Sequence, residues 1–168
     1  MERTRENYLT WLRDAHAMEE QALTMMRGLT SRLEHYPELR MRIEQHISET
    51  EGQERALQQL LDGYASDSSF MKDAMAKMAA AGQAISGMFT TDEVVKGGIA
   101  SYTFEHMEIA AYEVLITTAE EIGDSHATSI FKEILAQEEA MAEWLRDNLP
   151  PTVAQFLRRN EVKLTAKR

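Results

Sequence analysis

The sequence has no cysteine, and it contains three prolines and two tryptophans in 168 residues. Without cysteine there is no disulfide, no thiolate metal ligand and no thiol nucleophile, which fits a reducing compartment. No stretch approaches the about 18 uninterrupted apolar residues that a membrane-spanning helix needs. The charged opening residues, MERTREN, lack the apolar region of a signal peptide. We therefore expect a soluble cytoplasmic protein with no membrane partner.

Positive charge is also in short supply. The chain has 18 Lys and Arg residues against 28 Asp and Glu residues, for a formal net charge of -10. This balance argues against nucleic acid as the main partner and is compatible with binding cations. Residues 150–168 are the exception, with five basic side chains and one acidic one. We expect an acidic domain over residues 1–149 followed by a basic C-terminal tail over 150–168.

Ala, Leu, Met, Glu and Gln dominate the composition, which favours helix nearly throughout. Apolar residues recur in alternating steps of three and four, which is typical of helices packed against other helices. The pattern predicts main helices over about 3–33, 37–64, 90–122 and 124–148, with a Met- and Ala-rich crossover over about 66–88. Asn148-Leu-Pro-Pro is expected to end the last helix. The predicted fold is all-α, a ferritin-like four-helix bundle with a helical crossover between the second and third main helices.

The stretch Tyr102-Thr-Phe-Glu-His-Met-Glu-Ile-Ala-Ala-Tyr112 places carboxylates where apolar side chains belong. Glu105 lies in the same seam as Tyr102 and Tyr112, and Glu108 borders it one turn later. A carboxylate facing a bundle core costs several kcal/mol unless a cation or a set of donors meets it. The sequence therefore predicts a cation or a hydrogen-bond network at this level.

Glutamates also lie near the middles of the other three main helices. Four inward glutamates, Glu19, Glu49, Glu105 and Glu138, can hold a pair of divalent ions in such a bundle. The usual histidine three residues after the second and fourth glutamates is missing, because Gly52 and Met141 stand there. His46 and Glu108 lie one turn from Glu49 and Glu105 and can compensate. The predicted metal ligands are Glu19, His46, Glu49, Glu105, Glu108 and Glu138, with His16, Gln53, Tyr112 and Gln137 as hydrogen-bonding partners around them.

Several of these residues also have simpler interpretations. Any one glutamate can reach solvent or pair with a basic residue, and His16 and His46 can be hydrogen-bonded core groups. His106 is turned away from Glu105 and is expected to pack or to lie at the surface. His35 and His126 lie at helix ends and are expected to be solvated. Oxygen-rich ligation favours Fe or Mn over Zn or Cu, with the choice between Fe and Mn left open.

Runs such as WLRDAHAMEEQA, YPELRMRIEQHISET, FEHMEIAAYEVL and AQEEAMAEWL resemble the YciE/YciF family of ferritin-like bacterial stress-response proteins. The resemblance spans most of residues 5 to 160. It implies a homodimer of ferritin-like bundles with a dinuclear metal site similar to that of rubrerythrin. The positions that match the family's polar centre are Glu19, His46, Glu49, Gln53, Glu105, Glu108 and Glu138. The chain departs from the family at Gln137, where a glutamate is expected.

Three functions follow as hypotheses. The first is a dinuclear iron or manganese protein of the stress response, with redox activity toward dioxygen or peroxide, bridged by Glu49 and Glu138 and with Glu19 and Glu105 terminal. The second is a non-enzymatic, metal-sequestering or structural stress-protective homodimer. The third is an interaction module that acts through the basic tail. Whether the protein is an enzyme stays open, and mineral storage is less favoured because no feature of one chain indicates a cage.

Overall fold

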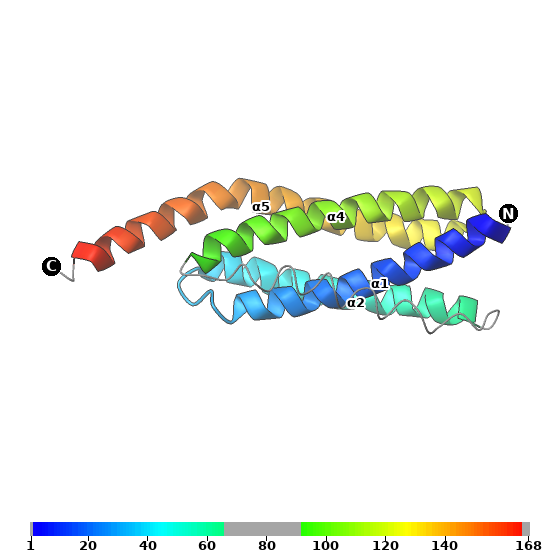
Figure 1. Ribbon diagram of the computed structural model, residues 1–168, viewed down its shortest axis with the longest axis horizontal. Helices are drawn as coiled ribbons and strands as arrows, with labels where there is room; N and C mark the ends of the chain where they lie inside the picture. Colours follow the sequence, from blue (N-terminus) through cyan, green and yellow to red (C-terminus); the bar gives the residue numbers. More distant parts are fainter. Residues whose placement is uncertain (1, 66–91, 166–168) are drawn as a thin grey trace.

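A computed structural model of the protein describes residues 2–65 and 92–165 (Figure 1). These residues form four helices: α1 (Glu2–Thr30), α2 (Pro37–Ala65), α4 (Glu93–Glu121) and α5 (Ser125–Thr165). The predicted all-α class and the four main helices are confirmed. The predicted crossover over about 66–88 lies outside the described residues.

Each of the four helices packs against two of the others. α1 packs on α2 and α4 packs on α5, and the two hairpins meet where α1 contacts α4 and α2 contacts α5. In Figure 1, α2 ends at the right of the bundle and α4 begins at the left. The end of α2 and the start of α4 therefore lie at opposite ends of the bundle, as they do in ferritin-like bundles.

The helix ends follow from local chemistry. Pro37 is the first residue of α2, where its missing N–H costs nothing. Gly123 takes a positive φ of 76° after α4, which glycine adopts without strain. Asp124 then begins the next helix, because its Oδ1 accepts a hydrogen bond of 2.9 Å from the N–H of Ala127. The α4–α5 turn is therefore fixed by two consecutive residues.

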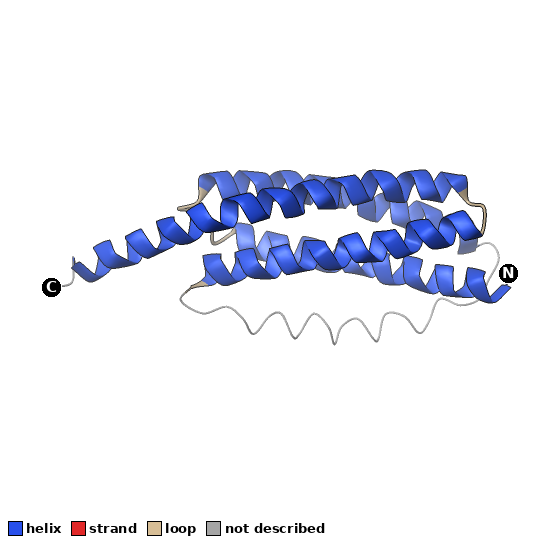
Figure 2. Ribbon diagram, turned by 90° about the horizontal axis from the view of Figure 1, so that it is seen from above, coloured by secondary structure: helices blue, strands red, loops and turns tan. Residues whose placement is uncertain are grey.

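The prediction that Asn148-Leu-Pro-Pro ends the last helix is wrong, since α5 continues through both prolines to Thr165. Each proline removes one N–H donor, and the carbonyls left over belong to Arg146 and Asp147. Both residues are exposed, so water can bond to those carbonyls. The last part of α5 projects past the other helices (Figure 2).

Residues after the prolines nevertheless contact the bundle. Phe156 packs against the core. Gln155 Nε2 donates a hydrogen bond of 2.9 Å to the carbonyl of His35, and the guanidinium of Arg159 lies 5.8 Å from the ring centre of Tyr36. The first turns of the predicted tail are therefore part of the packed structure.

The interior has apolar layers on either side of a polar middle. The described helices bury apolar side chains such as Leu12, Leu57 and Phe131, and at mid-length they also bury several charged ones. None of the described helices is long and apolar enough to cross a membrane. The polar middle is therefore the feature of the fold that calls for an explanation.

Candidate metal centre

Three helices bring an imidazole and two carboxylates together at the middle of the bundle. His46 Nε2 on α2 lies 3.2 Å from Glu105 Oε2 on α4 and 3.2 Å from Glu138 Oε2 on α5. The side chains of His46, Glu105 and Glu138 are 1%, 3% and 0% exposed. One ligand atom from each lies within 4.8 Å of the other two, so the group can hold a metal ion. The sequence predicted all three of these residues as ligands.

Glu19 and Glu108 complete the buried acidic cluster. Glu19 is 0% exposed and Glu108 is 1% exposed. Glu19 interacts electrostatically with Glu138, His46 and Glu105, and Glu108 interacts with Glu19, Glu138 and Glu105. Tyr112 donates a hydrogen bond to Glu19 Oε1. Four buried carboxylates from three helices thus surround one histidine.

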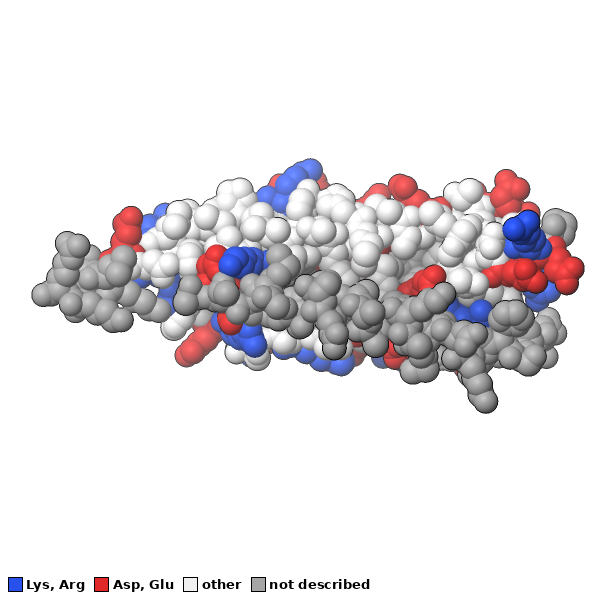
Figure 3. All heavy atoms as spheres, in the orientation of Figure 1, with Lys and Arg blue, Asp and Glu red and all other residues white. Residues whose placement is uncertain are grey.

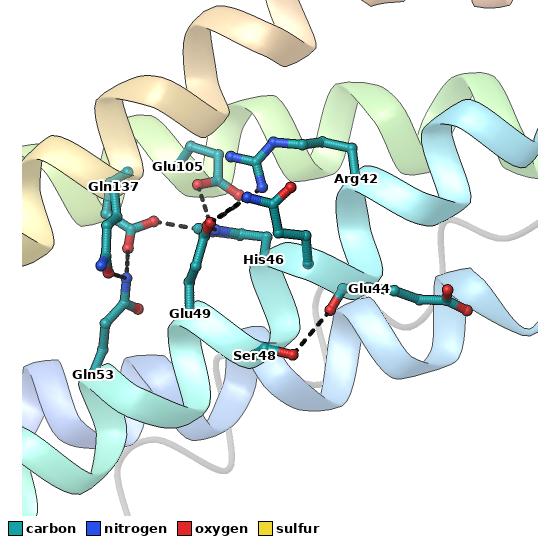
Figure 4. Close-up of polar contacts among 10 residues, drawn as sticks. Arg42, Glu44, His46, Ser48, Glu49, Gln53, Glu105 and Gln137 are labelled. Atoms are coloured by element: carbon teal, nitrogen blue, oxygen red, sulfur yellow. Dashed lines mark hydrogen bonds and ion pairs between the residues drawn. The ribbon is translucent and has the colours of Figure 1, made fainter.

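Glu49 lies at the edge of this cluster, next to His46 on α2 (Figure 4). Its side chain is 22% exposed, and its Oε2 lies 2.8 Å from His46 Nδ1 and 3.3 Å from Arg42 Nη1. Gln45 Nε2 donates a further hydrogen bond of 2.8 Å to Oε1. Among the predicted ligands, Glu49 is therefore the one whose charge an arginine already balances.

The acid–base properties of the cluster reflect burial. Burial and the neighbouring Glu138 raise the pKa of Glu19 to about 8. Burial raises the pKa of Glu105 to about 7 against the opposing effect of His46, and burial with Glu19 holds the pKa of Glu108 well above its usual range. Burial by itself lowers the pKa of His46, but its contacts with Glu105 and Glu138 outweigh that and raise it to about 11. Without a metal, the cluster thus holds protons that isolated carboxyl groups lose.

Four carboxylate oxygens of the cluster are buried with too few donors among the described residues. Glu19 Oε2 and Glu108 Oε1 have no hydrogen-bond partner there. Glu105 Oε2 and Glu138 Oε2 both face the single His46 Nε2, at 3.2 Å from each. A buried carboxylate oxygen without a donor is costly, and a cation is the partner that would satisfy several at once. The donor set of one imidazole and several carboxylates suits iron or manganese. The buried His46, Glu105 and Glu138 group can therefore hold a metal ion.

Amide side chains orient part of the cluster. Gln53 Nε2 donates to Glu138 Oε1 and, over 2.8 Å, to Gln137 Oε1. Figure 4 shows Gln53 reaching from α2 toward Gln137 on α5. Holding a ligating carboxylate by its second oxygen fixes the direction in which the first oxygen points. Gln53 and Tyr112 thus donate hydrogen bonds to carboxylates of the cluster, and Gln137 accepts one from Gln53.

His16 lies elsewhere. Its Nε2 is 2.9 Å from Glu54 Oε1 and its Nδ1 is 3.9 Å from Glu20 Oε2, and both of these glutamates lie outside the cluster. His106 is exposed and its ring stacks edge-on against Tyr102, with 4.6 Å between the ring centres. His35 and His126 are exposed as expected. Of the five histidines, His46 is the one that the fold places at the centre.

Sequence reasoning missed two kinds of residue at this site. Arg42, the partner of Glu49, precedes it by two helical turns, and that spacing could have identified it. Thr50 and Ser101 bury hydroxyl groups without a hydrogen-bond partner in the described structure. A small hydroxyl residue on a helix seam gives no distinguishing pattern, so these two could not have been found from the sequence.

Carboxylate-bridged metal proteins of the ferritin-like type also bury glutamates and histidines at mid-length of a four-helix bundle. Residues 3–158 match the family described as "Domain of unknown function (DUF892)", and the chain belongs to that family.

Solved structures agree with this assignment. A protein from Xanthomonas campestris pv. campestris is 40% identical, with 95% of this chain and 99% of that chain covered and a TM-score of 0.79. The Escherichia coli stress protein YciF is 24% identical, with coverages of 92% and 99% and a TM-score of 0.77. YcfI from Rhodopseudomonas palustris is 21% identical, with coverages of 85% and 92% and a TM-score of 0.70. The fold implied by the resemblance to the YciE/YciF family is confirmed.

Proposed function

We propose that this chain binds a dinuclear centre of iron or manganese between its four helices. The observation that carries the proposal is the shortage of donors for four buried carboxylate oxygens around His46. Two of them, Glu19 Oε2 and Glu108 Oε1, have no hydrogen-bond partner among the described residues, and those of Glu105 and Glu138 share the one His46 Nε2. Four ionised carboxylates carry the charge that two divalent cations balance, whereas a single imidazolium balances only one of them. Glu19, His46, Glu105, Glu108 and Glu138 would hold the ions, with Glu49 at the edge.

The proposed activity is redox chemistry toward dioxygen or peroxide in a stress response. Bound iron or manganese would supply one-electron chemistry toward such small oxidants. The chain's own residues exclude bulk water, hold the carboxylates through Gln53 and Tyr112, and keep His46 between two of them. The stress role is carried from the fold likeness to YciF, which is described as a stress protein. Runs such as WLRDAHAMEEQA and FEHMEIAAYEVL further favour YciE over YciF as the family member that this chain resembles more.

Metal analysis of protein purified without chelator tests this function. We expect two ions per chain in the wild type and loss of stoichiometric metal in Glu105→Ala and Glu138→Ala. Glu139→Ala, which changes the neighbouring exposed glutamate on α5, is the matched control and should keep both ions. Retention of two ions in the Glu105 and Glu138 variants would refute the proposal. An optical spectrum before and after peroxide tests the redox part.

The alternative is a non-enzymatic role, in which the metal is sequestered or stabilises a stress-protective homodimer. The burial of the cluster favours this alternative, since Glu19 and Glu138 are both 0% exposed. A site that is closed to substrates can still stabilise the fold by the binding free energy of its ions. This alternative predicts metal binding without consumption of peroxide, and turnover of peroxide by the loaded protein would exclude it.

We also propose that the protein is a homodimer through the outward face of α4. Ile99, Met107 and Val114 are 47%, 48% and 45% exposed, and with Thr103 and Ala110 they form one stripe along the helix. Figure 3 shows a largely uncharged surface along α4. If two copies met antiparallel about the midpoint between Met107 and Ala110, Lys96 of one copy would face Glu121 of the other. The pattern is thus self-complementary under two-fold symmetry.

Light scattering coupled to size-exclusion chromatography tests the dimer. Met107→Lys should give a monomer, because two copies of the new charge would meet in an apolar interface. Met41→Lys is the control, since Met41 is 65% exposed on α2 and lies outside the stripe. A wild-type protein that is monomeric at micromolar concentration, or a Met107→Lys variant that stays dimeric, would contradict this proposal.

A further inference from the structure

A file of four aromatic rings leads from the acidic cluster toward one end of the bundle. Tyr112, which donates to Glu19, lies 6.3 Å from Phe131 between ring centres. Phe131 lies 6.3 Å from Tyr8, and Tyr8 lies 5.7 Å from Tyr64. Tyr112, Phe131 and Tyr8 are all 0% exposed. The four helices each contribute one ring to this aromatic file.

The outer end of the aromatic file has a hydrogen-bond chain with a defined direction. Tyr64 donates its hydroxyl proton to Asp124 Oδ2. The hydroxyl oxygens of Tyr8 and Tyr64 lie 3.2 Å apart, and because the Tyr64 proton is engaged, Tyr8 is the donor. Burial and Asp124 raise the pKa of Tyr64 to about 12, so its proton stays in place at neutral pH. The carboxylate of Asp124 is therefore placed to accept the hydroxyl proton of Tyr64.

This end is also open to small molecules. Tyr64 and Asp124 line an open cavity of about 650 Å³ together with Arg5, Gly123 and His126. A second cavity of about 370 Å³ shares Tyr64, Asp124 and His126 with the first. A small reductant in either cavity can therefore reach the outermost ring of the file.

A buried phenol loses an electron readily only if its proton leaves at the same time, because a phenol cation in an apolar core is very costly. Tyr64 satisfies this condition through Asp124, and Tyr8 satisfies it through Tyr64. Phe131 has no proton to lose, so it serves as a packed bridge between Tyr112 and Tyr8. The proton acceptor Asp124, the closely spaced rings and the open cavities therefore lie in the same part of the molecule.

We propose that the aromatic file transfers single electrons between the acidic cluster and the surface cavity, with the Tyr8–Tyr64 pair as the resting place of the radical. In the oxidation step, Tyr64 gives one electron through the file to an oxidised site at the acidic cluster. Its hydroxyl proton moves to Asp124, which leaves a neutral phenoxyl radical. In the reduction step, a one-electron donor of the ascorbate class in the cavity reduces the radical, and Asp124 returns the proton to Tyr64. The natural oxidant, a peroxide-treated metal centre, rests on the proposed function, but the tyrosine pair can be tested without metal.

The metal-free test uses the absence of cysteine, which makes a single His126→Cys residue a unique attachment point for a ruthenium polypyridyl photo-oxidant. After a flash with a sacrificial electron acceptor, we expect the optical and electron paramagnetic resonance signals of a neutral tyrosyl radical. Tyr64→Phe should lose most of that signal. Asp124→Asn should reduce it several-fold, although an asparagine keeps the oxygen that caps α5. Equal radical yields in the parent and both variants would overturn the proposal.

The metal-loaded test asks whether the file conducts over its whole length. Addition of peroxide to iron-loaded protein should generate a tyrosyl radical that Tyr64→Phe or Phe131→Leu diminishes while the metal content stays unchanged. Tyr36→Phe is the control, because Tyr36 immediately precedes α2 and lies outside the aromatic file. A loaded protein that consumes peroxide but shows the same radical in all variants would refute the relay alone. Failure to bind metal would instead refute the proposed function and leave the metal-free result standing.

Discussion

At the residue scale, surroundings decide what a mid-helix glutamate does. Glu49 and Glu138 were predicted to play the same bridging role. Glu49 is partly exposed beside Arg42, whereas Glu138 is 0% exposed between His46 and Gln53. The first has its charge balanced by a permanent cation, and the second relies on a titratable imidazole and an amide. We therefore expect the buried carboxylates, and not Glu49, to bind the metal ions.

Glu108 gives the sharpest residue-scale prediction. Its side chain is 1% exposed and its Oε1 lacks a hydrogen-bond partner in the described structure. Glu108→Leu should raise the free energy of unfolding of the metal-free protein at neutral pH, by about 1 to 3 kcal/mol, because it removes a buried unsatisfied group. The same variant should lose metal. Urea unfolding in chelator measures the first effect, with the exposed Glu113→Leu as control, and a destabilised Glu108→Leu would contradict it.

At the element scale, close approach of the helices depends on small residues at the start of α4. A Cβ added to Gly97 would lie 2.6 Å from Leu29 Cδ1 of α1, and one added to Gly98 would lie 2.9 Å from Leu149 Cδ1 of α5. Two adjacent glycines thus let α4 sit against two neighbours at once. Leu149 immediately precedes the prolines, so this contact also fixes α5 where it leaves the bundle.

The two prolines inside α5 lead to an element-scale prediction. A proline in a helix interior costs about 3 kcal/mol relative to alanine. Pro150→Ala with Pro151→Ala should therefore slow amide hydrogen exchange in residues 152–162 and raise the unfolding free energy. Pro37→Ala is the matched control, and it should give little or no gain because Pro37 occupies the first turn of α2. Faster exchange after the double substitution would show that α5 does not form a continuous helix there.

At the scale of the whole molecule, the metal-free bundle should be less stable at higher pH. The folded-state pKa values of Glu19 and Glu105, about 8 and about 7, exceed the ordinary value of 4.5, so the folded state binds more protons than the unfolded state in between. Stability contributed by such groups is present below pH 4.5 and is lost as pH rises through 7 and 8. His46, with its raised pKa, acts in the same direction.

Chemical unfolding in chelator at pH 5, 6, 7 and 8 measures this dependence. Since one pKa unit corresponds to about 1.4 kcal/mol, the expected loss across the series is on the order of a few kcal/mol. Saturating metal should reverse the trend, because the ions bind deprotonated carboxylates. Stability of the metal-free protein that rises with pH over this range would show that the carboxylates are already ionised and otherwise compensated.

The sequence by itself determined the helices and indicated the three residues of the candidate site that the structure brings together, His46, Glu105 and Glu138. Periodicity in steps of three and four identified α1, α2, α4 and α5, because an apolar stripe must be buried whatever its partner. Glu105 and Glu138 stood out for the same reason, as charges on a stripe that has to face the core. Among the described residues, local rules failed at Asn148-Leu-Pro-Pro, where α5 continues through both prolines and Phe156 packs against the core, and at the end of α1, which lies at Thr30 and not near residue 33.

Only the tertiary structure decided which side chains meet. It placed His46 against Glu105 and Glu138, moved Glu49 to the edge with Arg42, and paired His16 with Glu54. It also aligned Tyr112, Phe131, Tyr8 and Tyr64 from four separate helices. Spacing along one helix fixes a face, but the neighbours of that face depend on how helices pack, which a single sequence does not specify.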